Sequence, residues 1–364
     1  MKKVIAVILV LVLFISCGRP DLGEADSIIE KAIQERVFPG AVLLVGTSDK
    51  ILYEKAYGHH TYAEDSPKVT RGSLFDLASL TKVFATSMCA MKAIDSGLID
   101  PEDFVVDYLP EFNNHGKDQI RIKHLLMHNS GMPSYTRALA TREETLESIM
   151  EISMNKAIGD YTYSCLNFIT LMRVIESASG KMMWEFYNEN FTDPMRLKHT
   201  FFVPDESLWG KCLPTIGDSS GTQVKLQGKV HDPLALALEG YSGNAGLFST
   251  ASDLAAFCQL MLNEGEYKGR RYVRPETIEP FKTVQDGFRS YGWGVNNTRS
   301  SAGSKMAKTA IGHTGYTGTS AWIDLERDVF VILLTNRVYP QDTAEIFQIR
   351  RAVADASMSA MFGL

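Results

Sequence analysis

The sequence predicts an α+β fold in which both ends of the chain build one unit and an all-α segment is inserted between them. One helical pattern and two strand-like runs come before residue 60. Helical patterns then dominate to about residue 240, and strand-like runs return only after residue 290, before a last helix. Strands grouped at the two ends, rather than alternating with helices, are typical of an α+β unit.

The N-terminal part predicts one helix followed by a hairpin. Glu24–Val37 has the spacing of an amphipathic helix and is ended by Pro39-Gly40. Ala41–Thr47 and Ile51–Tyr57 are strand-like, and only Ser48-Asp49-Lys50 separates them. A separation this short indicates two strands joined by a tight turn.

The middle of the chain predicts mainly helices. A long helical pattern runs from about Ser79 to Ser96 and is stopped by Gly97. Further helical segments follow at Ile120–His128, Arg142–Met154, Leu166–Ser179 and Lys181–Asn190. Leu213–Asp232 is polar and rich in glycine, which predicts a loop.

The C-terminal part predicts a helix, then strands, then a final helix. Ala251–Leu262 is helical, and Tyr291–Val295 is a candidate strand. Ser320–Asp324 and Val329–Thr335 are strongly strand-like and joined by a charged turn, and Ala344–Met361 is helical. We therefore expect a single domain over residues 22–364, with an α/β part at about 22–78 and 245–364 and a helical part at about 79–244.

The first seventeen residues predict a signal peptide. Lys2 and Lys3 precede an apolar run over residues 4–15, which is too short to span a bilayer comfortably. The segment 14–17 resembles a bacterial lipoprotein box, with Cys17 as the lipidated residue, although Phe14 replaces the usual leucine. We expect export and a lipid anchor on the outer face of a bacterial membrane. A plain signal peptide with an incidental cysteine is the alternative.

Composition argues against several other classes of protein. The net charge of −6 disfavours a nucleic-acid partner, which usually needs a basic face. Cys89, Cys165, Cys212 and Cys258 show no C-x-x-C spacing, so we expect neither a metal site nor a redox motif, and no cofactor. Cys89 and Cys258 lie in apolar helical patterns, which predicts that they are core residues.

Ser79 and Lys82 form the strongest chemical pattern. A serine hydroxyl is a poor nucleophile until a nearby base takes its proton. Residues three apart share one face of a helix, so Lys82 places an amine beside Ser79. The start of a helix also offers unpaired N–H groups to a developing oxyanion. A helix-capping serine beside a solvated lysine is the structural alternative.

Two rival serines need to be weighed. Ser153 and Lys156 repeat the S-x-x-K spacing, but at the C-terminus of a predicted helix, where the field opposes an oxyanion. Ser219 lies in a G-x-S-x-G pattern, which requires a strand before it and a helix after it. No helical pattern follows Ser219, so we expect a surface loop there.

Several motifs in fixed order carry a family resemblance. They are Phe75–Lys82, His124–Met132, Tyr161–Cys165, Val230–Asp232, Gly243–Thr250 and Gly312–Gly315. Together they resemble the serine β-lactamase and low-molecular-weight penicillin-binding-protein superfamily, class C-like and including its esterase-like branches. The resemblance covers about residues 24–360. It implies a β-lactamase/transpeptidase-like fold, in which an antiparallel sheet is flanked by helices and carries an all-α subdomain.

The resemblance also implies roles for individual residues. Tyr163 would share proton transfer with Lys82, and His313, with Thr314 and Gly315 after it, would face the substrate. The backbone N–H groups of Ser79 and Tyr316 would form the oxyanion hole. Ser79 would then attack a carbonyl and form an acyl-enzyme, with a small-molecule or peptidoglycan-derived substrate. A lysine that acts as a base must be neutral, so the pKa of Lys82 would have to fall.

Two positions depart from the family pattern. Cys165 stands where the family has asparagine, and His313 stands where the family has lysine, or histidine in its esterase-like branches. Both departures favour an esterase-like or broad hydrolase over an efficient β-lactamase. A catalytically weak envelope protein that keeps the fold as a binding or scaffold module is the alternative, and the intact Ser79, Lys82 and Tyr163 argue against it.

Overall fold

A six-stranded antiparallel sheet is built from the two ends of the chain. The computed structural model describes residues 20–219, 222–342 and 346–364, so the predicted signal peptide and Cys17 lie outside it. The strands are β1 (Gly40–Gly46), β2 (Ile51–Gly58), β10 (Gly294–Val295), β11 (Ile311–Thr314), β12 (Ser320–Asp324) and β13 (Val329–Thr335). Their order across the sheet is β10-β11-β12-β13-β1-β2. The N-terminal hairpin therefore pairs with the last strand of the chain.

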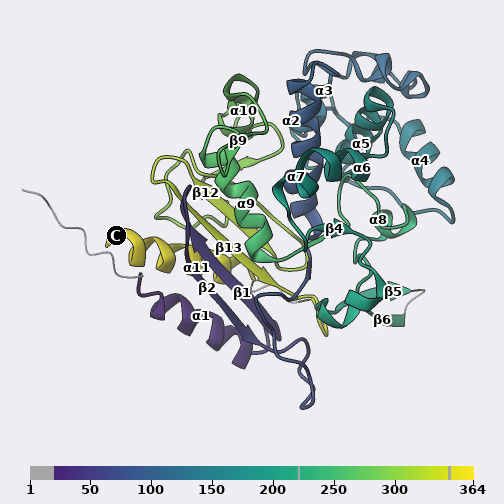
Figure 1. The fold of residues 1–364 in the computed structure, drawn as a ribbon. Helices are drawn as coiled ribbons and strands as arrows, with labels where there is room; N and C mark the ends of the chain where they lie inside the picture. Colours follow the sequence, from purple (N-terminus) through teal and green to yellow (C-terminus); the bar gives the residue numbers. More distant parts are fainter. Residues whose placement is uncertain (1–19, 220–221, 343–345) are drawn as a thin grey trace, which may run out of the picture.

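Helices cover both faces of this sheet. α1 (Gly23–Gln34) and α11 (Ile346–Phe362) pack together on one face, and α9 (Ala251–Leu262) lies on the other (Figure 1). Strand β1 shows why both faces are apolar. Ala41, Leu43 and Val45 point into the core with α1 and α11, whereas Val42 and Leu44 join the larger core on the opposite face. Side chains alternate across a strand, so one apolar run feeds two cores.

The helical part stands beside the sheet (Figure 1). Its helices are α2 (Ser87–Asp95), α3 (Ile122–Leu126), α4 (Arg142–Glu151), α5 (Cys165–Ser179), α6 (Met183–Tyr187), α7 (Asp193–Met195) and α8 (Pro233–Ala237). A small sheet in the order β3-β7-β4 lies at its base, formed by Phe75–Asp76, Leu247–Ser249 and Phe201–Phe202. The remaining elements are α10 (Pro275–Lys282) and the short hairpin of β8 (Glu266–Tyr267) and β9 (Arg270–Arg271).

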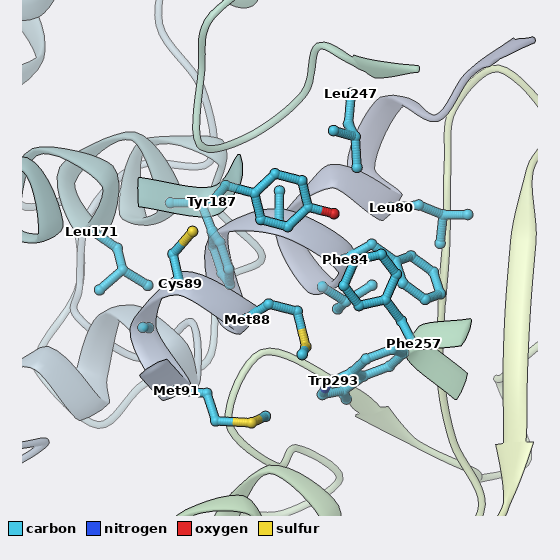
Figure 2. Close-up of a cluster of buried hydrophobic side chains, with 14 of the residues drawn as sticks. Leu80, Phe84, Met88, Cys89, Met91, Leu171, Tyr187, Leu247, Phe257 and Trp293 are labelled. Carbon is cyan, nitrogen blue, oxygen red and sulfur yellow. The ribbon is translucent and has the colours of Figure 1, made fainter. Parts of the chain in front are cut away.

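The segment that follows Ser79 is fixed in the larger core. Phe84 packs edge-on against Trp293, with ring centroids 5.5 Å apart, and also contacts Phe257 of α9. Figure 2 shows these rings beside Met88 and Cys89, all fully buried. Loss of an aromatic ring from such a core costs about 3–5 kcal/mol. The core thus holds the nucleophile segment against both α5 and α9.

The α+β fold with a helical insertion is confirmed, and several elements match closely. Ser320–Asp324, Val329–Thr335 and Ala251–Leu262 have the predicted bounds. Cys89 and Cys258 are core residues, as predicted. The candidate strand at 291–295 is only two residues long, at Gly294–Val295.

Two predictions about the middle of the chain are wrong in detail. The helix expected over Ser79–Ser96 is a 3-10 turn at Ala78–Leu80, a π-helical stretch at Lys82–Thr86 and then α2. The loop expected over 213–232 contains a hairpin of β5 (Thr215–Ser219) and β6 (Thr222–Leu226). Backbone pairing satisfies the polar groups of this segment, and residues 223–226 alternate polar and apolar, a short strand pattern that the loop prediction did not use.

Candidate active site

Ser79 lies on a strained turn at the start of the first helical segment. Ala78 has a φ of +46°, an unusual conformation for a residue with a Cβ. The Asp76 carboxylate holds the turn, because it accepts hydrogen bonds from the Ala78 N–H at 2.8 Å and the His231 N–H at 2.7 Å. Ser79 is partly exposed, whereas Ala78 and Leu80 on either side are buried. The turn therefore presents one hydroxyl to the surface.

Lys82 lies directly beneath this hydroxyl. Its Nζ donates hydrogen bonds to Ser79 Oγ at 3.0 Å and to the Asn244 carbonyl oxygen at 2.9 Å, and it lies 3.5 Å from Cys165 Sγ. The Asn244 side chain is in turn held by Asp232 Oδ1 at 3.0 Å. Lys82 is fully buried, so these contacts replace its hydration. Ser79 and Lys82 are therefore in contact, as their spacing in the sequence predicts.

The charge of Lys82 differs from the prediction. Burial alone lowers the pKa of this amine, but the negative charge that Cys165 and Tyr163 can carry raises it, and the net pKa is above its ordinary value. The expectation of a lowered pKa is therefore wrong. Lys82 is an ammonium at neutral pH, and the amine that would act as a base is not present in the resting site.

Tyr163 and Cys165 reach the site from the segment that leads into α5. Ser164 caps this helix, accepting a hydrogen bond from the Asn167 N–H. The Tyr163 ring lies 4.6 Å from the His128 ring and 5.7 Å from the His313 ring, centroid to centroid, and 5.1 Å from Lys82 Nζ. Residues from three distant parts of the sequence therefore meet around Lys82.

Strand β11 and its following turn form the opposite wall. Thr317 Oγ1 donates to the Asp76 carbonyl oxygen at 2.7 Å, and Thr319 Oγ1 donates to the Leu77 carbonyl oxygen at 3.0 Å. A Cβ at Gly315 would lie 2.3 Å from the Leu77 oxygen, so only glycine fits there. Tyr316 lines the same cavity as Ser79, and its N–H makes no backbone hydrogen bond within the described part of the chain.

Comparison with known proteins places this geometry in a family. The family model described as Beta-lactamase matches residues 25–355. The chain belongs to the β-lactamase family.

Two curated relatives of this β-lactamase-family chain are close enough to compare along most of their length. One is an "N-acetylmuramyl-L-alanine amidase" of Bacillus subtilis, 31% identical, with 90% of this chain and 84% of the relative covered. The other is a "Putative D-alanyl-D-alanine carboxypeptidase" of Escherichia coli K12, 30% identical, with 85% and 82% covered. The chain is accordingly a serine hydrolase of the β-lactamase family.

Solved structures show the same fold. A penicillin-binding protein homologue from Caulobacter crescentus superimposes with a TM-score of 0.77 at 17% identity, covering 94% of this chain and 98% of that one. EstCE1, a hydrolase with promiscuous acyltransferase activity, gives a TM-score of 0.73 at 21% identity, covering 91% and 98%. The predicted antiparallel sheet with flanking helices is therefore confirmed.

A cavity of about 670 Å³ opens in front of Ser79. It is lined by Tyr163 on the helical side and by His313, Thr314, Gly315 and Tyr316 on the β11 side. Cys165 is not among its lining residues, although its sulfur contacts Lys82. Ser79, Tyr163 and the residues 313–316 therefore line one cavity, whereas Lys82 and Cys165 are in contact with each other but do not line it.

His313 does not supply the positive charge that a lysine would. Burial and the nearby cations Arg289 and Lys82 hold the pKa of His313 well below its ordinary value, so the ring is neutral. His313 Nδ1 lies 2.9 Å from the Thr314 carbonyl oxygen. A carbonyl oxygen can only accept, so Nδ1 carries the proton and Nε2 is left as an acceptor. His313 is therefore neutral near pH 6 and does not replace the charge of a lysine.

Arg289 is a cavity residue that the sequence motifs did not reveal. It precedes β10 and lines the cavity, with 6% of its surface exposed. A single arginine in the segment between α10 and β10 matches none of the family motifs. Only the folded chain places it near His313.

Neither rival serine is among the residues that line this cavity. Ser153 and Lys156 are exposed and follow the end of α4. Ser219 ends strand β5, and the next element is strand β6 rather than a helix. The strand–turn–helix context of a nucleophile elbow is absent at Ser219. The segment around Ser219 is thus a hairpin rather than the predicted loop. Ser219 still lacks the following helix that a nucleophile elbow requires.

Proposed function

We propose that this serine hydrolase acts through an acyl-enzyme formed on Ser79, and that its substrates are amides or esters of cell-wall-derived peptides. The observation that carries the proposal is the 3.0 Å contact between Lys82 Nζ and Ser79 Oγ, since Ser79 also lines the cavity. A hydroxyl hydrogen-bonded to a buried charged group, open to a cavity, is the arrangement expected of an activated nucleophile.

Because Lys82 already carries its proton, we propose Tyr163 as the group that accepts the proton of the Ser79 hydroxyl. An ammonium cannot accept the Ser79 proton, so we assign that proton to the Tyr163 oxygen, which must first release its own proton to solvent, and the adjacent Lys82 charge favours this form. The Ser79 oxygen then bonds to the substrate carbonyl carbon, and the leaving group departs with the proton returned from Tyr163. In the second half of the reaction, water attacks the acyl carbon and gives its proton to Tyr163. The Ser79 oxygen then leaves and takes that proton back. Lys82 thus acts as a fixed charge between Ser79 and Tyr163.

The oxyanion of this reaction requires donors aimed at the carbonyl oxygen. The N–H groups of Ser79 and Tyr316 are the candidates. The Thr317 and Thr319 bonds to the nucleophile turn hold the two segments together, which supports this assignment. Fixed donors of this kind cost no reorganisation during the reaction, and loss of one typically lowers the rate by about 100- to 1,000-fold.

Two facts support cell-wall peptides over β-lactams as substrates. The Bacillus subtilis and Escherichia coli relatives carry names of cell-wall enzymes. Cys165, in place of the family asparagine, offers only a weak hydrogen-bonding group for the acylamino side chain of a β-lactam. We therefore expect penicillins to acylate Ser79 slowly compared with peptide or ester substrates.

Access to cell-wall peptides requires export. The segment 1–17 supports secretion and lipid attachment at Cys17, as part of the same proposal. Among residues 20–219, 222–342 and 346–364, no helix has the length and apolar character to cross a membrane. Incorporation of labelled palmitate into the wild type, and its loss in Cys17→Ala, would test the anchor.

Covalent labelling of Ser79 tests the reaction. A fluorophosphonate probe should label the wild type stoichiometrically and fail to label Ser79→Ala, as judged by intact mass. Ser153→Ala and Ser219→Ala are the matched controls and should label normally. Labelling of Ser79→Ala, or loss of labelling in Ser219→Ala alone, would contradict the proposal.

A further inference from the structure

The motif His124–Met132 contributes no group to the reaction proposed for Ser79. Its central residue, His128, is fully buried and is not among the residues that line the cavity. His128 has a φ of +59°, a conformation that is uncommon for a residue with a Cβ. Backbone strain of this kind persists only where surrounding contacts fix it. The contacts of His128 therefore indicate what the strained conformation achieves.

His128 holds the backbone on both sides of Tyr163. Its carbonyl oxygen accepts a hydrogen bond from the Thr162 N–H at 2.8 Å. Its ring nitrogen Nδ1 accepts another from the Ser164 N–H at 3.0 Å. One residue therefore fixes the peptide groups before and after Tyr163, which limits the directions in which the Tyr163 side chain can point.

The His128 ring also packs against the Tyr163 ring itself. The two ring centroids lie 4.6 Å apart with the planes inclined by 37°, and the His128 ring lies 5.0 Å from the ring of Phe168 in α5. Aromatic pairs at such separations contribute about 0.5–1.5 kcal/mol beyond the area that they bury. The Tyr163 ring, which lies 5.1 Å from Lys82 Nζ, is thus supported by a neighbour that does not contact Lys82 in the described part of the chain.

His128 supports Tyr163 as a neutral ring. Because Nδ1 accepts the Ser164 N–H, the single ring proton is on Nε2. Burial, together with the nearby charges of Arg289 and Lys82, holds the pKa of His128 well below its ordinary value. A second proton could bind only at Nδ1, where it would point at the Ser164 N–H. The neutral form is therefore the one that keeps the contact with the Tyr163 segment.

The residues after His128 extend the same contact along the chain. The Pro133 carbonyl oxygen accepts a hydrogen bond from Ser164 Oγ at 2.6 Å. The Ser134 carbonyl oxygen accepts one from the Cys165 N–H at 2.8 Å. The segment 128–134 therefore runs beside the start of α5 and fixes several successive residues there.

His124, in the same motif, uses the same chemistry at a different place. Its Nδ1 accepts a hydrogen bond from the Arg121 N–H at 3.0 Å, at the start of α3. His124 has no aromatic contact with Tyr163 in the part of the chain that the structure describes. It is therefore a matched reference for a histidine that accepts a backbone N–H away from the reacting groups.

We propose that His128 is a positioning residue, which holds the Tyr163 oxygen where it can accept the proton of Ser79. The proposal rests on the proton transfer to Tyr163 proposed above. A misplacement of about 1 Å at a reacting group can lower a rate by about 100-fold. Since His128 does not line the cavity, its loss should lower kcat while KM stays close to the wild-type value.

Two substitutions at His128 are compatible with its backbone conformation, because glycine and asparagine both tolerate a positive φ. His128→Gly removes the ring and the Nδ1 acceptor, so kcat for a chromogenic ester should fall by about 100-fold. His128→Asn supplies an amide oxygen as a new acceptor for the Ser164 N–H and should recover about 10-fold of that loss. His124→Asn is the matched control and should keep the wild-type kcat. Melting temperatures show whether each variant is folded.

A double-mutant cycle with Tyr163→Phe distinguishes positioning of Tyr163 from general damage to the site. Tyr163→Phe keeps the ring that packs on His128 and removes the oxygen that accepts the proton. If His128 acts through that oxygen, adding His128→Asn to Tyr163→Phe should lower kcat no further. Additive losses, or wild-type kcat in His128→Asn, would overturn the proposal. The cycle uses only the asparagine variant, so it does not depend on the folding of His128→Gly.

Failure of the proposed function would give different results. Wild-type kcat in Tyr163→Phe would overturn the proton transfer to Tyr163, and with it the role of His128. Labelling of Ser79→Ala by the fluorophosphonate probe would overturn the acyl-enzyme. Neither measurement involves a His128 variant, so these failures are distinguishable from failure of the positioning role alone.

Discussion

The two walls of the cavity are built in different ways. The wall that carries Ser79 and Lys82 is local, because its key residues are three positions apart in one helical segment. The wall that carries His313, Tyr316 and Arg289 is assembled from a strand, its following turn and a separate loop. The local wall keeps the family motif, while the assembled wall departs from it. The catalytic pair is therefore given by spacing along the chain. The residues expected to set specificity meet only through tertiary packing.

Substitution of Lys82 should cause the largest loss of activity, and it tests the wall that carries Ser79 and Lys82. Lys82→Ala removes the charge that contacts Ser79 Oγ and lies beside Tyr163, so the acylation rate should fall by about 100- to 10,000-fold. Stopped-flow measurement with a chromogenic ester checks this. Lys156→Ala, in the exposed second S-x-x-K match, should have wild-type activity.

Tyr163→Phe distinguishes the role of Tyr163 from that of Lys82. If Tyr163 takes the proton while Lys82 holds its charge, the single variants and the double variant should lose similar amounts of activity. Full activity in Tyr163→Phe would mean that Lys82 loses its proton after substrate binds and acts as the base itself.

Modification of Cys165 should have the next largest effect. A small thiol reagent should inactivate the wild type, because a group added at Cys165 Sγ displaces Lys82 Nζ from its 3.5 Å contact. Cys165→Ser should resist the reagent. The other described cysteines are buried, and burial raises the pKa of Cys212 to about 12 and that of Cys89 well above its ordinary value. Equal inactivation of wild type and Cys165→Ser would place the reactive thiol elsewhere.

The pH dependence of substrate binding tests the assembled wall. The pKa of His313 is held well below 6.5, so the ring gains its proton only far below that pH and is neutral above it. The KM of a carboxylate-bearing ester should therefore stay constant between about pH 6 and 7.5. His313→Lys should lower this KM several-fold across the range. A KM that falls in the wild type as pH approaches 6 would show that His313 is cationic after all.

Relief of strain at Ala78 should be the smallest effect. Ala78→Gly removes a Cβ from a residue with a φ of +46°, so unfolding should require roughly 1 kcal/mol more free energy. Urea denaturation measures the change. Ala90→Gly, in the interior of α2, is the matched control and should lose about 1 kcal/mol. The same loss in both variants would mean that the turn carries no strain.

Sequence reasoning succeeded where the signal is local. The apolar runs of β12 and β13 gave their bounds, and the spacing of Ser79 and Lys82 gave their contact. It failed for β5 and β6, because the alternation of polar and apolar residues over 223–226 is short and lies in a segment that is otherwise polar and rich in glycine. It also missed Arg289, because a single arginine outside any motif is ordinary until the fold buries it.

By itself, then, the sequence determined which residues could do chemistry, and the tertiary structure decided their charge. A spacing of three residues places two side chains on one face of a helical turn, and Lys82 contacts Ser79 although Ser79 lies in a 3-10 turn and Lys82 in a π-helical stretch. Protonation depends on what else is packed nearby. Burial lowers the pKa of Lys82, but the negative charge that Cys165 and Tyr163 can carry raises it above its ordinary value; burial together with Arg289 and Lys82 holds the pKa of His313 well below its ordinary value. Those neighbours come from distant segments, and only the folded chain brings them within electrostatic reach.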